Sequence, residues 1–148
     1  MKRLLNFSNV VLYAVTPELK DENVLLIKVG QLLDGGVDVI QLRSHHMCDR
    51  DILRLGFTIK GLCEKAGALF ILNNRPDLAL AMDADGVHLG HRDIPVADAR
   101  KILGFKKIIG ASAHSVSQAL EAQKAGADYV SCGPIWSTPT KPDYAAVG

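Results

Sequence analysis

The sequence has few of the features that mark secreted or membrane proteins. It contains 3 cysteines, Cys48, Cys63 and Cys132, with no CxxC pair. An odd count without that spacing excludes a disulfide framework and favours free thiols in a reducing cytosol. No apolar run approaches the roughly 18 residues of a membrane-spanning helix. The amino-terminal segment also lacks the small-residue cleavage site of a signal peptide. We therefore expect a cytoplasmic protein without a membrane partner.

A surplus of either charge is also missing. The chain has 17 Lys and Arg against 16 Asp and Glu, for a formal net charge of +1. Neutralising nucleic-acid phosphates needs a surplus of basic residues, so we expect no nucleic-acid partner. The sequence contains no GxSxG, P-loop or GxGxxG segment, and so nothing supports a hydrolase elbow, a Walker site or a dinucleotide fold.

Length sets a further bound. The chain has 148 residues, enough for one domain. A complete (β/α)₈ barrel needs roughly 200 residues. Any barrel predicted from this sequence is therefore incomplete.

What the sequence does contain is an alternation of short apolar runs with amphipathic segments. The apolar runs predict strands at 10–15, 37–43, 69–73, 86–89, 107–111 and 129–133. The amphipathic segments predict helices at 23–33, 49–66, 76–82, 96–103 and 115–125, with Asp49 as an N-cap and a capping box from Ser115 to Gln118. Such alternation predicts an α/β fold with a parallel sheet. An open flavodoxin-like sheet needs only about five strands, so strand number alone leaves both an open sheet and a barrel possible.

A weak repeat accompanies three of these strands. The segments GGVDVIQL, DADGVHLG and AGADYVSCG each place Gly or Ala and then Asp before a strand. In parallel α/β folds the turns before strands serve stability, whereas functional residues follow the strands. We therefore interpret the repeat as structural.

Polar residues gather after the strands, where function is expected. They are Gln41, Arg43, His45 and His46; Asn73 and Asn74; His91 and Asp93; Ser112 and His114; and Thr138, Thr140 and Lys141. Gln41 and Arg43 are two residues apart and share one face of a strand. The Arg43 guanidinium suits phosphate oxygens, and Lys141 with the two threonine hydroxyls suits a second phosphate. Asp93 near two amide side chains fits a Mg²⁺ ion that also takes oxygens from a diphosphate.

Other interpretations of the same residues are open. His88, His91 and Asp93 have loose metal-ligand spacing, but His88 inside an apolar strand is more typical of a core or cleft histidine. His45 and His46 are typical of an exposed loop pair. Trp136 fits a hydrophobic anchor as well as a surface on which a substrate stacks.

Six segments together resemble a known family. They are YAVTP, VIQLR, LFILNNRPDLAL, ADGVHLGHRD, IIGASAHS and GADYVSCGPIWSTPTKPD, within a match that runs from about Leu12 to Gly148. In this order they are similar to thiamine-phosphate synthases and their thiazole tautomerase-like relatives. The resemblance implies a TIM (β/α)₈ barrel, here with about six βα units. It also implies a transferase that joins hydroxymethylpyrimidine diphosphate to hydroxyethylthiazole phosphate, releasing pyrophosphate with the help of Mg²⁺.

The resemblance assigns roles to individual residues. It implies that Gln41 and Arg43 hold the diphosphate and that Asn73 contacts the pyrimidine or the diphosphate. His45 is a further expected substrate-binding residue. Ser112 would lie beside the reacting centre, and Thr138, Thr140 and Lys141 would close over the leaving group. Asp93 would bind Mg²⁺ together with Asn74. Arg43, Ser112 and Lys141 are the expected catalytic residues.

Two positions depart from the family pattern. The family usually has lysine where this chain has His45, and Asn-Asp where this chain has Asn73-Asn74. Both changes reduce the charge available at the site. A histidine at the position of His114 is linked to thiazole tautomerisation, although synthases also carry it. A tautomerase-like isomerase and a non-catalytic phosphate-binding relative therefore stand as alternatives.

The six βα steps also bear on the extent of the domain. We expect residues 1–148 to form a single barrel domain that lacks units seven and eight. An open sheet exposes its edge strands and much apolar surface. We therefore expect a longer chain or self-association.

Overall fold

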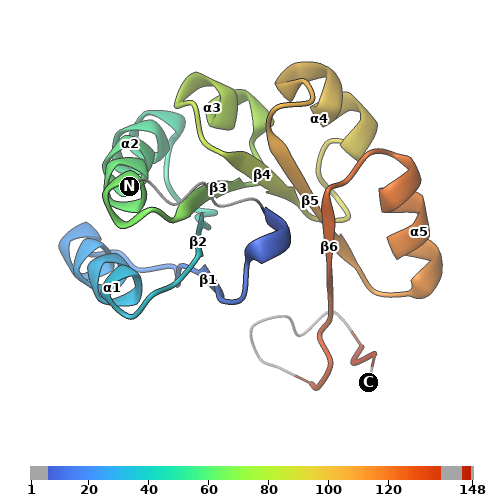
Figure 1. Cartoon of the computed structure of the whole chain (residues 1–148), viewed down its shortest axis with the longest axis horizontal. Helices are drawn as coiled ribbons and strands as arrows, with labels where there is room; N and C mark the ends of the chain where they lie inside the picture. The colour runs from blue at the N-terminus through green and yellow to red at the C-terminus, as the bar shows by residue number, and fades with distance from the viewer. Residues whose placement is uncertain (1–6, 138–144, 148) are drawn as a thin grey trace.

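A curved parallel sheet organises the computed structural model, which describes residues 7–137 and 145–147. Its strands are β1 (Tyr13–Val15), β2 (Val39–Leu42), β3 (Leu69–Asn73), β4 (Gly86–Leu89), β5 (Ile108–Ala113) and β6 (Tyr129–Cys132). They pair in the order in which they occur in the chain, and every pair is parallel. Figure 1 shows the sheet curling into an arc with the helices along its outer side, so the α/β prediction is confirmed as a half-barrel.

The helices follow the strands as the amphipathic segments predict. They are α1 (Glu22–Asp34), α2 (Asp49–Ala66), α3 (Pro76–Ala81), α4 (Val96–Leu103) and α5 (Val116–Lys124), preceded by the short 3₁₀ helix η1 (Phe7–Asn9). The bounds of α2, β3, β4 and α4 equal those predicted. No helix of the described residues is long and apolar enough to cross a bilayer.

The first strand is shorter than predicted. Residues 10–12 lie outside β1, and the backbone N–H groups of Val11 and Leu12 are donated to the Asp38 carboxylate at 2.8 and 3.0 Å. The Asp38 carboxylate thus accepts hydrogen bonds from two N–H groups that would donate to a neighbouring strand if β1 were longer.

Two helix-cap predictions need correction. Cys48, not Asp49, is the N-cap of α2, and the Asp49 carboxylate instead accepts hydrogen bonds from Arg75 at 2.6 and 3.0 Å. Ser115 does cap α5, because its hydroxyl accepts the Gln118 N–H at 3.2 Å. The Gln118 side chain, however, accepts from the His114 N–H at 2.7 Å, so the return bond of a capping box is displaced by one residue.

Alternation along the strands separates the core from the concave face. Buried residues such as Ile40, Phe70 and Val87 belong to the cluster that packs against Ile59 and Met82 of the helix layer. Their neighbours in each strand point to the opposite, concave face because side chains alternate. This alternation places Gln41, Asn73, His88 and Ser112 inside the arc.

The two edges of the sheet are less well covered. Helix α5 contributes no buried residue, and β6 is largely exposed along its length. Val11 at the other edge is 91% exposed. The core therefore thins toward both edges.

The repeated Asp residues lie at the amino ends of β2, β4 and β6. Each carboxylate accepts a backbone N–H from the preceding strand or its approach. Asp85 accepts from Phe70 at 2.7 Å and Asp128 accepts from Ile109 at 2.7 Å, just as Asp38 does from the approach to β1. The residue two positions earlier has a positive φ in every copy: Gly36 (85°), Asp83 (54°) and Gly126 (97°). The repeat is therefore structural, as interpreted from the sequence.

Candidate functional site

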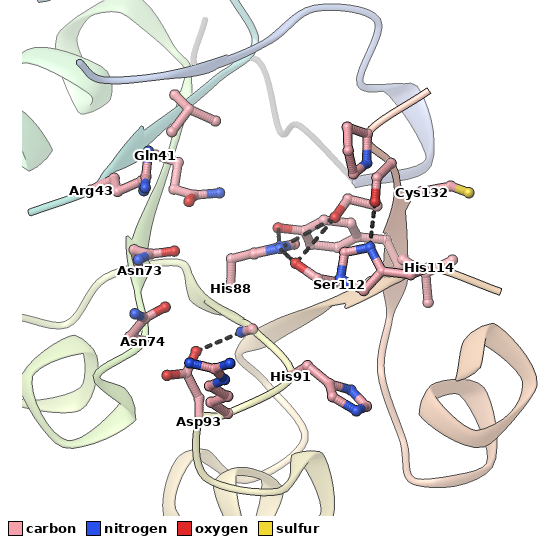
Figure 2. A pocket seen from close by; sticks show the side chains of 18 of the residues that line it. Gln41, Arg43, Asn73, Asn74, His88, His91, Asp93, Ser112, His114 and Cys132 are labelled. Atoms are coloured by element: carbon pink, nitrogen blue, oxygen red, sulfur yellow. Dashed lines mark hydrogen bonds between the residues drawn. The ribbon is translucent and has the colours of Figure 1, made fainter. Parts of the chain in front are cut away.

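A cavity of about 790 Å³ opens at the carboxyl ends of the strands. Figure 2 shows its wall, with Gln41, Arg43, Asn73 and Asn74 on one side and Ser112 and His114 on the other. The site residues predicted from the sequence that fall among the described residues all line this cavity: Gln41, Arg43, His45, Asn73, Asn74, Asp93 and Ser112. Four consecutive strand ends thus bring them together. The predicted residues Thr138, Thr140 and Lys141 lie outside the described residues.

The end of β2 carries a cluster of charged and basic groups. The Arg43 backbone N–H is donated to the buried Thr16 hydroxyl at 3.0 Å, which fixes the start of the loop. The Arg43 Nε donates to Nε2 of His45 at 3.2 Å. The Glu18 carboxylate lies 3.9 Å from Arg43, 3.5 Å from His45 and 3.1 Å from His46. Both histidines are exposed, as expected of a loop pair, but Glu18 joins them to the arginine.

Oxygen-bearing side chains follow β3 and β4. Asn74 has a positive φ of 65°, a conformation that asparagine adopts more readily than most residues, and its N–H is donated to the His88 carbonyl at 2.9 Å. The Asp93 carboxylate accepts the Gly90 N–H at 2.5 Å. Burial raises the pKa of Asp93, against the smaller lowering effects of that hydrogen bond and of His45. The donor set of one carboxylate and two amide side chains is one that Mg²⁺ accepts.

The interior of the arc holds polar residues that the sequence interpretation missed. Tyr13 and Tyr129 line the cavity, and their hydroxyl oxygens are 2.8 Å apart. His88 lies between Tyr129 and Ser112 and is buried, which confirms a core or cleft histidine. The two tyrosines lie in short apolar runs and are easily taken for core residues. Period-two alternation along β6 was the available signal, since it places Tyr129 on the same face as Ser131.

The other side chains give no support to a transition-metal site. Among the described residues, no group of three or more His, Cys, Asp and Glu side chains is arranged to hold a metal ion. His91 is exposed at the rim, and His114 directs Nδ1 to the Gly133 carbonyl. Trp136 is 80% exposed and lies outside the cavity lining.

Fold and site together define a class. Sequentially ordered parallel strands, an outer helix layer and a polar cavity at the strand carboxyl ends are the arrangement of (β/α) barrel enzymes. The 3-dehydroquinate dehydratase of Geobacillus kaustophilus shares this fold with a TM-score of 0.67 at 13% identity, over 84% of this chain and 62% of that one.

Closer similarity identifies the family. The family model described as thiamine monophosphate synthase matches residues 12–148. The thiamine-phosphate synthase of Halalkalibacterium halodurans is 44% identical over 133 residues, covering 89% of this chain and 63% of its own. That of Chlorobium luteolum is 51% identical over 113 residues, covering 76% of this chain and 53% of its own. The chain belongs to the thiamine monophosphate synthase family, which confirms the resemblance.

A solved structure agrees with this assignment. The thiamine phosphate pyrophosphorylase of Pyrococcus furiosus superposes with a TM-score of 0.83 at 41% identity, over 90% of this chain and 65% of that chain. The chain spans between half and two thirds of the length of these relatives.

Proposed function

We propose that this chain carries the diphosphate half of a thiamine-phosphate synthase site, in an enzyme of thiamine biosynthesis that couples hydroxymethylpyrimidine diphosphate to hydroxyethylthiazole phosphate. One observation carries the proposal. The family-matching residues Gln41, Arg43, Asn73, Asp93 and Ser112 converge on one cavity from four strand ends. The matching relatives named thiamine-phosphate synthase support it, and no observation favours the tautomerase-like alternative.

The proposed reaction is a displacement at the methylene carbon of the pyrimidine. The C–O bond to the diphosphate breaks, pyrophosphate leaves with the bonding electrons, and the electron-rich pyrimidine stabilises the carbon cation. The thiazole nitrogen then donates its electron pair to form the new C–N bond. The protein's main contribution is charge at the leaving group and alignment of the two rings.

The chain's own residues fit these tasks. Arg43 faces the cavity with about a third of its side chain exposed, and its planar fork can bind two phosphate oxygens. Ser112 offers a hydroxyl beside the reacting centre. Thr138, Thr140 and Lys141 are proposed to close over the leaving group.

We also propose that Mg²⁺ binds at Asp93 and Asn74. Because the Asp93 pKa is raised by burial, its carboxylate lacks a charge partner strong enough to offset desolvation. A divalent cation would supply that partner and would neutralise diphosphate charge when bound. Asn74 stands where the family has aspartate, so we expect weaker Mg²⁺ binding than an aspartate would give.

Pyrophosphate release tests the proposal. Mixing the chain with both substrates and Mg²⁺ should release pyrophosphate and form thiamine phosphate, and omitting either Mg²⁺ or the thiazole phosphate should abolish product. We expect Asn74→Asp to lower the Mg²⁺ concentration needed for half-maximal rate. No release by the folded chain, with no binding of the diphosphate substrate in calorimetry, would contradict the proposal.

Further aspects of the proposal concern location and partners. The free cysteines support a cytoplasmic protein, and the charge balance supports one without a nucleic-acid partner. The matching relatives support small phosphorylated molecules as partners, and we propose no membrane partner. Exposed apolar side chains, such as Val11 before β1 and Val116 at the start of α5, support self-association. Sedimentation equilibrium tests this point, and a monomer at all concentrations would contradict it.

A further inference from the structure

Buried and half-buried polar side chains inside the arc form one continuous network of hydrogen bonds. The Gln41 Nε2 donates to the Tyr13 hydroxyl at 2.7 Å, and that hydroxyl lies 2.8 Å from the Tyr129 hydroxyl. The Tyr129 hydroxyl lies 2.9 Å from Nδ1 of His88, whose Nε2 lies 3.0 Å from the Ser112 Oγ. The residues of this hydrogen-bond network belong to β2, β1, β6, β4 and β5 in turn. Figure 2 shows its last link, from His88 to Ser112.

The amide at one end fixes the direction of the first bond, from which we assign the others. An amide nitrogen donates and cannot accept, so the Tyr13 oxygen accepts from Gln41. A phenol has one proton, and every hydroxyl proton finds an acceptor within the network when Tyr13 donates to Tyr129 and Tyr129 donates to Nδ1 of His88. With Nδ1 accepting, neutral His88 carries its proton on Nε2 and donates it to Ser112. Burial raises the pKa of both tyrosines, so both hydroxyls keep their protons.

The last residue receives more than one donor. The Ser131 hydroxyl donates to the Ser112 oxygen at 3.5 Å, in addition to the bond from His88, and its oxygen also lies 3.4 Å from the His88 Nε2. A serine oxygen has two acceptor lone pairs and one proton. With its lone pairs occupied from inside the arc, Ser112 has its own proton to donate to a ligand.

The packing of the Tyr129 ring fixes the position of its hydroxyl in this hydrogen-bond network. Its ring stacks on Phe7 with centroids 4.2 Å apart and an interplanar angle of 19°. On β5 a Cβ at Gly110 would lie 2.0 Å from the Tyr129 Cζ, so only glycine leaves room for the ring there. The ring is therefore confined between η1 and the β5 backbone, which is a geometry that a solvent-exposed tyrosine would not need.

We propose that Tyr13 and Tyr129 are positioning residues that hold His88 in its Nε2–H tautomer and thereby make Ser112 a hydrogen-bond donor to an oxygen of the bound substrate. Neither tyrosine touches the reacting atoms in this role. The identity of the substrate rests on the proposed function, whereas the tautomer does not. The same folded protein therefore allows the two to be tested separately.

The tautomer of His88 is measurable by NMR of the ¹⁵N-histidine-labelled protein. We expect Nε2–H at His88. His114 serves as an internal reference of the opposite kind, because its Nδ1 bonds to the Gly133 carbonyl, which only accepts. An Nδ1–H tautomer at His88 in the parent protein would overturn the proposal.

Reversing the first donor gives the sharpest test. In Gln41→Glu, at a pH above the titration of the new carboxyl as followed by its ¹³C shift, the side chain only accepts. Tyr13 then donates to it, Tyr129 donates to Tyr13, and His88 must switch to Nδ1–H. Adding Tyr13→Phe removes the hydroxyl that connects residue 41 to Tyr129, so the double variant should retain Nε2–H at His88. A single variant that keeps Nε2–H, or a double variant that still switches, would overturn the proposal.

Binding shows whether the positioning matters. Tyr129→Phe keeps the ring and removes only the hydroxyl, and we expect Mg²⁺–pyrophosphate to bind about threefold to tenfold more weakly by calorimetry, as the loss of one oriented hydrogen bond implies. Phe57→Leu on α2 is the control, since Phe57 is exposed and lies outside the cavity lining, and its affinity should stay within about twofold. Unchanged affinity in Tyr129→Phe would overturn the positioning role. If the parent itself fails to bind pyrophosphate, the proposed function fails while the tautomer measurements still decide this inference.

Discussion

The two ends of the parallel sheet satisfy their polar groups in different ways. At the amino ends of β2, β4 and β6, one device occurs three times: a residue with positive φ, then an Asp whose carboxylate accepts a backbone N–H from the preceding strand or its approach. A basic side chain can provide a further partner for the carboxylate, since Arg100 donates to Asp128 at 2.7 Å. The carboxylates at this end therefore find hydrogen-bond partners within the protein.

At the carboxyl ends each strand carries a different side chain. Arg43, Asn73, Asp93 and Ser112 face a shared cavity, where a ligand can reach them. Groups that are not fully compensated within the protein gain most from a ligand. The comparison therefore separates residues that contribute to stability from residues that contribute to binding, and substitutions at the two ends should show opposite profiles.

The largest expected effect is on stability, from Asp38→Ala at the amino end. Asp38 is buried and accepts the N–H groups of both Val11 and Leu12. Leaving two donors without this acceptor should lower the free energy of unfolding by about 2–4 kcal/mol. Urea unfolding measures this loss. Asp38→Asn keeps one acceptor oxygen and should lose less, and equal losses in the two variants would contradict the role assigned to the carboxylate.

The next effect is on binding, from Arg43→Met at the carboxyl end. The variant keeps most of the apolar stem and removes the guanidinium, so its affinity for Mg²⁺–pyrophosphate should fall by about tenfold to a hundredfold. Its unfolding free energy should change by less than about 0.5 kcal/mol, because the Glu18 contact is long at 3.9 Å and exposed. Arg50→Met on the exposed start of α2 is the matched control and should leave binding unchanged. A large loss of stability with unchanged affinity would place Arg43 with the structural residues instead.

The same contrast explains what could be predicted from the sequence. The strands and helices follow from hydrophobic alternation, and Gln41 and Arg43 share a face because side chains alternate along a strand. The repeat was visible because its geometry is local: the turn and the Asp are adjacent in the chain. Even so, local reasoning failed at Asp49, whose carboxylate bonds to Arg75, 26 positions away, instead of capping its own helix.

Contacts between distant positions could not be predicted in this way. The Tyr13 and Tyr129 hydroxyls meet across 116 positions of sequence, and Gly110 is recognisable as the residue that admits the Tyr129 ring only once β5 and β6 are paired. The Glu18 carboxylate likewise joins Arg43, His45 and His46 through two loops. The Mg²⁺ site at Asp93 and Asn74, and the roles of Thr138, Thr140 and Lys141, stay predictions.

The smallest expected effect is on thermal stability, from Asp93→Asn at the carboxyl end. This substitution should stabilise the protein, whereas Asp38→Ala at the amino end should destabilise it. Burial raises the pKa of Asp93, so its ionisation disfavours the folded state at neutral pH. Asp93→Asn should therefore raise the melting temperature near pH 7 by about 1–3 °C, a modest gain because the group is partly exposed. The parent regains stability as pH falls through the raised pKa toward the ordinary value of 3.8, so the advantage of the variant should vanish near that value.

Magnesium distinguishes this explanation from a general effect of charge removal. If Asp93 binds Mg²⁺, the ion should raise the melting temperature of the parent and leave that of Asp93→Asn unchanged, since a ligand stabilises only the form that binds it. Asp98→Asn on α4 is the control, because Asp98 pairs with Lys101 outside the cavity, and this variant should respond to Mg²⁺ as the parent does. A lower melting temperature for Asp93→Asn at neutral pH would show that Asp93 is compensated within the protein, and the division between the two ends would not hold at this residue.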